Sequence, residues 1–190
     1  MANVRGMAFL GTAHWIKQRF GREELQAIVD GGGPATIEAF AHKIDGLATY
    51  PYAAFVGLLR SADARLGTGD LSYAKKLGDL AARADLQTIF RGYAARPDPE
   101  AMIRACAPVW SMYTEGAGQM VAESVDKDST ILSIYDFPAM DPAHCKLMEG
   151  WMIAAMDFVG AQVLPGARER KCMSCGDDRH EFWCRWELKG

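Results

Sequence analysis

The chain has 190 residues, of which 49% are hydrophobic and 24% are charged, and its formal net charge is -3. This length and composition are typical of one globular domain, residues 1–190, that buries a full core without help from metals or disulfides. The weakly acidic charge argues against nucleic-acid binding, which depends on clustered Lys and Arg.

The apolar stretches of the sequence are all short. The run Met7–Leu10 is shorter than the roughly 7–15 apolar residues of a secretory signal. The run Trp151–Met156 is much shorter than the roughly 20 residues of a membrane-spanning helix. We therefore expect a cytoplasmic protein that does not contact a membrane and whose five cysteines are reduced.

The first half of the chain is predicted to be helical. Residues Ala8–Phe20 carry apolar side chains at near-helical spacing, and Gly21 is a stop signal. A short helix over Glu23–Val29 ends in a run of three glycines, which does not predict a phosphate loop because no Gly-Lys-Ser/Thr follows. We therefore expect no nucleotide cofactor. Further helices are predicted over Ala35–Lys43, Tyr52–Ala64 and Leu71–Tyr93.

A helix that begins at Pro99 carries a regular apolar stripe. Proline is favoured at the first position of a helix. The stripe recurs at i, i+4, i+7, i+8 and i+11 and consists of Met102, Cys106, Val109, Trp110 and Tyr113. This pattern predicts a buried helix face with Cys106 as a core thiol.

The periodicity changes after Gly116. Two runs rich in β-branched and aromatic residues, Gln119–Val125 and Thr130–Phe137, predict a β-hairpin. Asp141 is then expected to cap a helix that ends near Val159. Two more strands are predicted over Ala161–Arg168 and His180–Glu187.

This order of elements predicts the α+β class. We expect a helical N-terminal half packed on an antiparallel sheet, with an intervening helix and a C-terminal hairpin that carries Cys and His. No repeat or linker divides the chain.

The C-terminal hairpin contains the spacing of a metal site. Zinc prefers thiolate and imidazole ligands, and Cys172 and Cys175 form a Cys-x-x-Cys pair with His180 nearby. With Cys184 as a fourth ligand, the spacing would be close to that of a zinc knuckle but one residue shorter. In an extended strand, however, His180 and Cys184 are about 13 Å apart, which is too far for one ion.

Three alternatives therefore remain for the hairpin: a zinc site without Cys184, a metal-free turn, and a knuckle. In the metal-free alternative Gly176 and Asp177 form the turn and the two nearby thiols are half-buried. In the first two alternatives Cys184 packs beside Phe182 and Trp186.

The same run resembles a known motif. The pattern Cys172-x-x-x-Gly176-Asp177-x-x-His180-x-Phe182-x-x-x-Trp186 is similar to the closing motif of 4-vinyl reductase-type (V4R) domains and of a related myxobacterial paralogous family of unknown function. In those families a Cys usually stands at the position of His180. Earlier pieces that match the myxobacterial branch in order are Arg19-Phe20-Gly21, Tyr50-Pro51, Leu77-Gly78, Trp110-x-x-Tyr113-x-x-Gly116, Phe137-Pro138 and Gly150-Trp151.

The resemblance implies a fold shared with haem–nitric-oxide-binding domains and with a vesicle-tethering subunit that holds an acyl chain. In aromatic-responsive transcription activators, a V4R domain binds phenols beside a zinc held by Cys, Glu, Cys and Cys. Carried over residue by residue, this set corresponds to Cys145, Glu169, Cys172 and His180, with Cys175 as the substitute if Glu169 points to solvent. The resemblance thus implies zinc as the cofactor. Haem is not expected, because the sequence singles out no axial ligand that faces a pocket.

A ligand pocket is predicted between two of the helices and the sheet. Aromatic and thioether side chains suit a pocket for apolar molecules. The candidates lie between the Met102–Tyr113 helix, the Asp141–Val159 helix and the sheet, and they are Trp110, Tyr113, Met148, Trp151 and Met152. Trp110 and Tyr113 can each offer a hydrogen bond to a polar substituent. In the alternative interpretation, the methionines only fill an irregular core.

The functional hypothesis is a non-catalytic sensory domain that binds an apolar or aromatic small molecule. We expect no catalytic residue, because these side chains contain no activated nucleophile or acid/base pair. A separate output protein and a homodimer are predicted partners, the dimer from the apolar excess around Trp183 and Trp186. The alternatives are an enzyme or accessory protein that acts on a small organic or tetrapyrrole substrate, and an adaptor without a ligand. No flavin or nicotinamide fingerprint supports a reductase.

Overall fold

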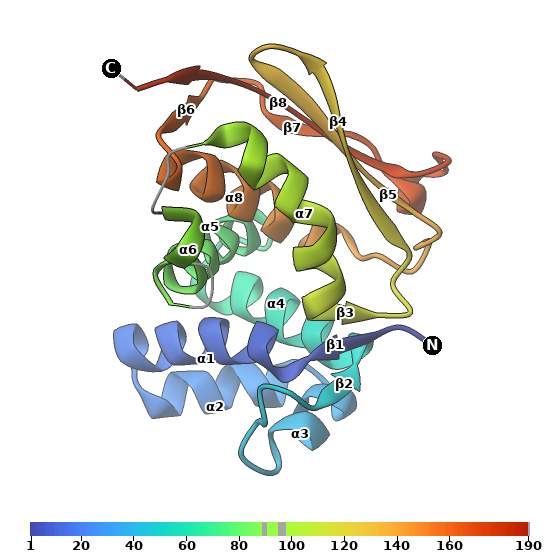
Figure 1. Cartoon of the computed structure of the whole chain (residues 1–190). Helices are drawn as coiled ribbons and strands as arrows, with labels where there is room; N and C mark the ends of the chain where they lie inside the picture. The colour runs from blue at the N-terminus through green and yellow to red at the C-terminus, as the bar shows by residue number, and fades with distance from the viewer. Residues whose placement is uncertain (89–90, 95–97, 190) are drawn as a thin grey trace.

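In a computed structural model, the helices of the first half of the chain pack beneath an antiparallel sheet formed by the second half (Figure 1). The predicted α+β class is confirmed. The structure describes residues 1–88, 91–94 and 98–189. The helices are α1 Gly6–Phe20, α2 Arg22–Gly31, α3 Pro34–Phe40, α4 Tyr52–Leu66, α5 Ser72–Gln87, α6 Arg91–Ala94, α7 Pro99–Tyr113 and α8 Pro142–Phe158, with a 3-10 turn, η1, over Met173–Cys175. The strands are β1 Asn3–Arg5, β2 Thr49–Pro51, β3 Thr114–Glu115, β4 Gln119–Asp126, β5 Ser129–Tyr135, β6 Ala161–Val163, β7 Arg168–Lys171 and β8 His180–Leu188.

The helix boundaries follow the signals in the sequence. Helix α1 ends at Gly21, whose φ of 93° is accessible mainly to glycine. At the start of α7 the Asp98 carboxylate accepts the backbone N–H of Ala101. At the start of α8 Asp141 accepts the N–H of Ala143 in the same way. Both caps satisfy an N–H that has no partner inside the helix.

The predicted helix Leu71–Tyr93 is wrong in its extent. Helix α5 ends at Gln87, and the Thr88 hydroxyl donates to the Ala84 carbonyl at 2.7 Å in its last turn. A separate short helix, α6, begins at Arg91. Residues 89 and 90, which the prediction included, lie outside the described residues.

The main sheet is built around β8, in the order β4-β5-β8-β6, with β7 paired to the same edge of β8 as β6. The predicted hairpin is confirmed as β4 and β5, with Gln119 opposite Tyr135. The predicted strand Ala161–Arg168 is instead divided into β6 and β7. The chain leaves the sheet between β6 and β7, because Pro165 has no N–H to donate to a neighbouring strand and Gly166 has a φ of 102°.

A small three-stranded sheet of order β2-β1-β3 was not predicted. Val4 lies at its centre and pairs with Tyr50 on one side and Thr114 on the other. These strands have two or three residues each, too few to show the alternation that identifies a strand from sequence.

Helices α5 and α8 pack with their backbones in contact. A Cβ atom added at Gly150 would lie 1.8 Å from the carbonyl oxygen of Lys75, and one added at Gly78 would lie 1.9 Å from that of Leu147. Only glycine permits such an approach. This crossing fixes the position of α8, which carries residues of both candidate sites.

The aromatic residues that predicted a homodimer are covered by the chain itself. Trp186 is buried in the core beside Phe182 and Cys184. Trp183 is half-buried beneath the guanidinium group of Arg170, 4.2 Å from the ring centre. The homodimer therefore stays a prediction, and the covered side chains of Trp183 and Trp186 no longer support it. In the part of the chain that the structure describes, no helix is long and apolar enough to cross a membrane.

Candidate functional site

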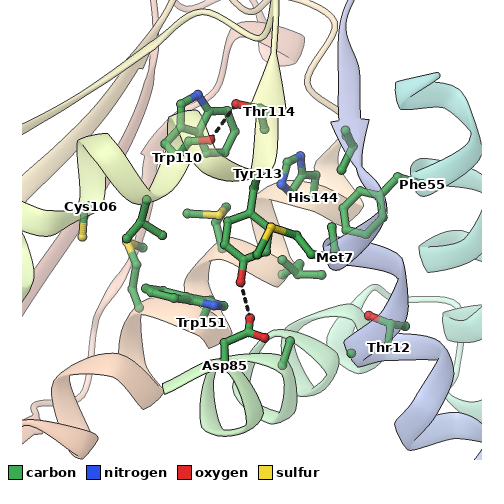
Figure 2. Close-up of a pocket in the computed structure, with 18 of the residues that line it drawn as sticks. Met7, Thr12, Phe55, Asp85, Cys106, Trp110, Tyr113, Thr114, His144 and Trp151 are labelled. Carbon is green, nitrogen blue, oxygen red and sulfur yellow. Dashed lines mark hydrogen bonds between the residues drawn. The ribbon is translucent and has the colours of Figure 1, made fainter. Parts of the chain in front are cut away.

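An apolar pocket lies between α1 and α5 on one side and α7 and α8 on the other (Figure 2). Its cavity has a volume of about 70 Å³. A buried water needs about 10–15 Å³ of such space, so the cavity holds roughly one small ring. The lining residues are Val4, Met7, Ala8, Gly11, Thr12, Phe55, Ala81, Asp85, Cys106, Val109, Trp110, Tyr113, Thr114, Met120, His144, Leu147, Met148, Trp151 and Met152.

The structure brings together all five candidate ligand-binding residues in this lining. They come from the facing sides of two helices, with Trp110 and Tyr113 on α7 and Met148, Trp151 and Met152 on α8. The two predicted helices do line the pocket, but its third side is formed by α1 and α5 rather than by the main sheet, which supplies Met120 alone to the described lining; Val4 and Thr114 come from the small sheet. The space between α7, α8 and the sheet holds a second cavity of only about 10 Å³.

The two side chains expected to orient a ligand are already hydrogen-bonded inside the protein. The Trp110 indole N–H donates to the Ala117 carbonyl at 3.2 Å. The Tyr113 hydroxyl donates to Asp85 Oδ2 at 2.5 Å. Burial and the neighbouring Asp85 raise the pKa of Tyr113 far above its usual range, so this hydroxyl stays protonated.

The sequence analysis missed the polar residues of the lining, among them Asp85 and Thr12. Asp85 lies on the apolar face of α5, and Thr12 lies on the apolar face of α1. Burial raises the pKa of Asp85, while hydrogen bonds from Tyr113 and Trp151 act to lower it. A polar residue within an apolar stripe was the signal that could have identified both positions.

His144 is a buried imidazole held by aromatic rings. Its ring stacks on Trp110 with centroids 5.5 Å apart, and Nδ1 lies 3.1 Å from the Tyr52 hydroxyl. That hydroxyl also accepts the N–H of Asp141, and it can donate its own proton to Nδ1 in the tautomer that carries the ring proton on Nε2. Burial, with repulsion from His180, lowers the pKa of His144 to about 3. The imidazole is therefore neutral.

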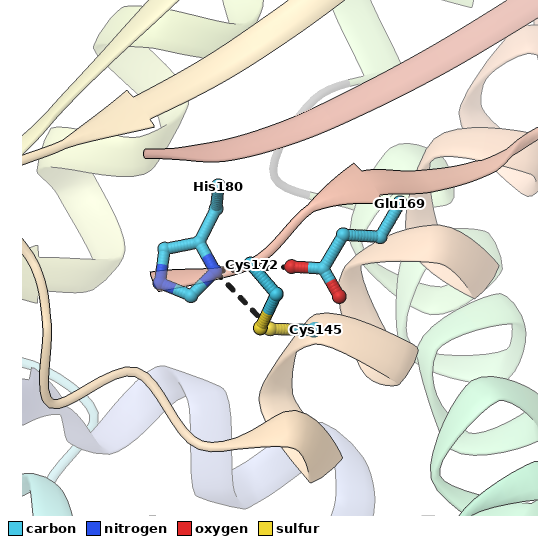
Figure 3. A group of neighbouring side chains, drawn as sticks. All are labelled: Cys145, Glu169, Cys172 and His180. Atoms are coloured by element: carbon cyan, nitrogen blue, oxygen red, sulfur yellow. Dashed lines mark hydrogen bonds and ion pairs between the residues drawn. The ribbon is translucent and has the colours of Figure 1, made fainter. Parts of the chain in front are cut away.

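A second candidate site lies beside the pocket, where α8 meets β7 and β8 (Figure 3). One potential ligand atom from each of Cys145, Glu169, Cys172 and His180 lies within 4.8 Å of the other three. We call these four residues the Cys/His cluster. Two sulfurs, a nitrogen and a carboxylate oxygen form a ligand set that suits tetrahedral zinc.

The orientation of His180 favours a cation in the Cys/His cluster. Its Nε2 lies 3.2 Å from the carbonyl oxygen of Phe137, which can only accept, so Nε2 carries a proton. In the neutral imidazole, Nδ1 then presents a lone pair 3.0 Å from Glu169 Oε1 and 3.5 Å from Cys145 Sγ. A lone pair this close to a carboxylate requires a proton or a metal ion between them.

Neighbouring groups hold the Cys/His cluster in place. Glu149 on α8 is buried, accepts the backbone N–H of Glu169 at 3.1 Å and forms an ion pair with Lys75 of α5. Burial opposes the charge of Glu149, but the lysines and this hydrogen bond keep its pKa below the usual value. The carboxylate of Asp177 accepts the backbone N–H of Cys172 at 2.7 Å. Glu149 thus ties β7 to α8, while Asp177 holds the turn after β7 closed.

The remaining candidate cysteines lie apart from the Cys/His cluster. Cys175 is exposed in η1, and Cys184 is buried with Phe182 and Trp186 as predicted. The turn closes at Gly176, whose φ is 97°. The Cys106 thiol donates to the Met102 carbonyl in the core of α7.

We expect thiol-specific alkylation at pH 8 to modify Cys175 rapidly and Cys106 and Cys184 very slowly. Burial raises the pKa of Cys106 to about 12 and that of Cys184 to about 11, so both lack reactive thiolate as well as access. Mass spectrometry of the folded protein would identify the modified sites. Cys175→Ser should abolish the rapid phase, and equal labelling of Cys106 would contradict the buried arrangement.

Comparison with known proteins identifies the fold but not a family. No family model and no curated protein matches the chain. Solved H-NOX (haem nitric-oxide/oxygen binding) proteins do match. A triple mutant from S. oneidensis in the Fe(II) state has a TM-score of 0.75 at 12% identity, with 98% of this chain and 97% of that chain covered. The Fe(II) unliganded protein from K. algicida has a TM-score of 0.73 at 13% identity, with 97% of both chains covered.

The predicted likeness to haem–nitric-oxide-binding domains is therefore confirmed at the level of the fold. The closer resemblance to V4R domains and the myxobacterial family stays a prediction. The expectation that haem has no part is wrong, because chains with this fold include Fe(II) proteins and one solved to probe haem distortion.

Haem does not fit the pocket as it stands. A cavity of about 70 Å³ is far smaller than a porphyrin, so haem binding would require the pocket to open. His144 and Cys106 are the described lining residues whose imidazole and thiol could bind iron. At present Tyr52 occupies Nδ1 of His144, and the Cys106 thiol is bonded to a backbone carbonyl.

Proposed function

We propose that this chain is a non-catalytic sensory domain that binds an apolar or aromatic small molecule in the pocket between α1, α5, α7 and α8. The convergence of Trp110, Tyr113, Met148, Trp151 and Met152 on one ring-sized cavity carries this proposal. Such a lining removes most of a ligand's apolar surface from water. This burial stabilises the complex by about 25 cal/mol for each Å² of apolar surface.

The chemistry of the described lining supports binding rather than catalysis. The buried thiol of Cys106 has a pKa raised to about 12, so it is a poor nucleophile. The imidazole of His144 has a pKa lowered to about 3, far below the range of an effective general base at neutral pH. Tyr113 keeps its proton, and its hydroxyl is bonded to Asp85.

We also propose that the Cys/His cluster binds zinc as a structural element. The close approach of His180 Nδ1 to Glu169 Oε1 (3.0 Å) and to Cys145 Sγ (3.5 Å) supports this. Burial raises the pKa of Cys145 and of Cys172, so both thiols are protonated without metal. Zinc binding must then release thiol protons and weaken as the pH falls. The homodimer and the separate output protein stay predictions.

Haem binding is a second candidate function, favoured by the H-NOX fold. Titration with haemin tests it. A one-to-one complex whose Soret band changes in His144→Ala would support haem binding through that imidazole. Haemin that gives only the spectrum of the free molecule would exclude this candidate.

We expect a thermal-shift screen of phenols, fatty acids and tetrapyrroles to find compounds that stabilise the protein. At 100 times the dissociation constant, a bound ligand adds about 2.7 kcal/mol to the free energy of unfolding. Trp110→Ala should weaken such a compound at least about tenfold, since it removes one wall of the cavity. Trp183→Ala, which truncates a half-buried tryptophan on the sheet, is the matched control and should bind normally. If no compound raises the melting temperature, the adaptor alternative replaces the sensory one.

A further inference from the structure

The small cavity between α7, α8 and the main sheet is lined largely by sulfur-containing side chains. Its volume is about 10 Å³, close to the space that one buried water needs, so it admits a small ion but no organic molecule. Half of its ten described lining residues are cysteine or methionine, whereas the whole chain of 190 residues has only five cysteines and ten methionines. The five sulfur residues are Met102, Cys106, Met152, Met156 and Cys184. We call this cavity the sulfur site.

Three elements of the fold bring these side chains together. Met102 and Cys106 are four residues apart on α7, so they lie on one face of that helix. Met152 and Met156 have the same spacing on α8. Cys184 comes from β8, the strand around which the main sheet is built. The two thiols are near enough to each other that a charge on Cys184 would act on Cys106. Two helices and a strand thus present sulfur to one cavity.

The described lining of the sulfur site offers no competing ligand of another kind. It contains no carboxylate and no imidazole. The Thr130 hydroxyl donates to the Glu123 carbonyl, and the Trp151 indole is hydrogen-bonded to Asp85. Zinc is held by sets of thiolate, imidazole and carboxylate, whereas thiolate together with thioether selects copper(I). The donor set therefore suits a soft monovalent ion and differs from that of the Cys/His cluster.

The protonation of the two thiols also favours a monovalent ion. Burial raises the pKa of Cys106 to about 12 and that of Cys184 to about 11, so both are protonated at neutral pH and Cys184 loses its proton more readily. A monovalent ion that displaces one proton leaves the site neutral, which apolar surroundings tolerate. A divalent ion would need both thiolates for the same balance.

We propose that the sulfur site binds one copper(I) ion through the sulfurs of Cys184 and Cys106 and a thioether of α8, from Met152 or Met156. The ion takes the place of the Cys184 proton, which passes to solvent. This inference does not depend on the proposed function. Cys106, Trp151 and Met152 line both cavities, so the sulfur site adjoins the ligand pocket.

A full-length chain that keeps only Cys106 and Cys184 tests the proposal. The changes Cys145→Ser, Cys172→Ser and Cys175→Ser remove two thiols of the Cys/His cluster and the exposed thiol, which would otherwise compete for the ion. Anaerobic titration with copper(I) against the chelator bicinchoninate should show one ion per chain. X-ray absorption spectroscopy of this complex should show only sulfur atoms around the copper.

Further variants of this triple variant assign the ligands. Cys184→Ser should weaken copper(I) binding at least about hundredfold, because it removes the thiolate. The pair Met152→Leu and Met156→Leu keeps the apolar volume and should weaken binding roughly tenfold. Met148→Leu is the matched control, since Met148 lies on the same helix and lines the ligand pocket but is not in the described lining of the sulfur site.

Each outcome decides for or against the sulfur site. A triple variant that is folded by circular dichroism but retains no copper(I) against the chelator would overturn the proposal. Nitrogen or oxygen atoms around the copper would also overturn it. If the triple variant does not fold, the wild type should bind one more copper(I) than its Cys184→Ser form, and equal numbers would be contrary to the proposal. Because the probe is the ion alone, these results leave the proposed binding of an organic molecule untouched.

Discussion

Gly150→Ala should unfold this protein or lower its melting temperature by at least about 10 °C, the largest effect expected of a single added methyl group. The new Cβ would lie 1.8 Å from the carbonyl oxygen of Lys75, an atom of the α5 backbone that no rotamer change can move. Overpacking a core typically lowers the free energy of unfolding by about 1–3 kcal/mol. We expect a clash between two helix backbones to lower it by more than this. Each kcal/mol shifts the melting temperature of a chain this long by roughly 2–4 °C.

Gly11→Ala is the matched control for this experiment. Gly11 also lies inside a helix, but its added Cβ would meet only the Ala81 side chain, at 4.0 Å. Alanine restricts the unfolded chain, so this variant should be neutral or more stable by about 0.5–1 kcal/mol. Differential scanning calorimetry of both variants checks the pair. A Gly150→Ala protein as stable as wild type would show that α5 and α8 are not in backbone contact.

Cys172→Ser should eliminate zinc binding, and with it a substantial part of the stability of the C-terminal hairpin. We expect the wild-type chain, purified without chelator, to contain about one zinc, since four ligand atoms are already gathered. Zinc at 1,000 times its dissociation constant would add about 4 kcal/mol to the free energy of unfolding. Elemental analysis and thermal unfolding with and without chelator measure the two quantities.

Cys184→Ser is the control for the metal experiment. Its thiol is buried in the core and lies outside the Cys/His cluster, so the variant should retain zinc although it loses some packing. Less than about a tenth of an equivalent of zinc in the wild type would contradict the metal proposal, as would a melting temperature indifferent to chelator. His180 and Glu169 would then form a simple ion pair.

The sequence predicted the parts of the fold that depend on local signals. Pro99, Asp141 and Gly21 act within one helical turn of their positions, so the helix ends could be located without knowledge of the fold. The strand β1 could not be found this way. Val4 is in a strand because Tyr50 and Thr114 lie on either side of it, and those residues are far away in the chain.

The candidate site was predictable for a different reason. The four residues of the Cys/His cluster were predicted from the resemblance to V4R domains, whose metal-ligand positions were carried over onto this chain. That Thr12 and Asp85 line one pocket depends instead on how α1 and α5 pack, and no spacing in the sequence relates these two residues. Trp110 and Tyr113 were identified as lining residues, but their polar atoms were assigned to a ligand when Ala117 and Asp85 already bind them.

The first turn of α8 holds consecutive residues of the two sites. His144 lines the pocket, and the next residue, Cys145, belongs to the Cys/His cluster. The turn is anchored by Asp141, which pairs with Arg60 at 3.0 Å and donates its N–H to Tyr52. Because one helical turn carries both side chains, we expect a displacement at either site to be transmitted to the other. Any resulting change in affinity must be reciprocal: a pocket ligand that strengthens metal binding is itself held more tightly by the metallated protein, by the same factor.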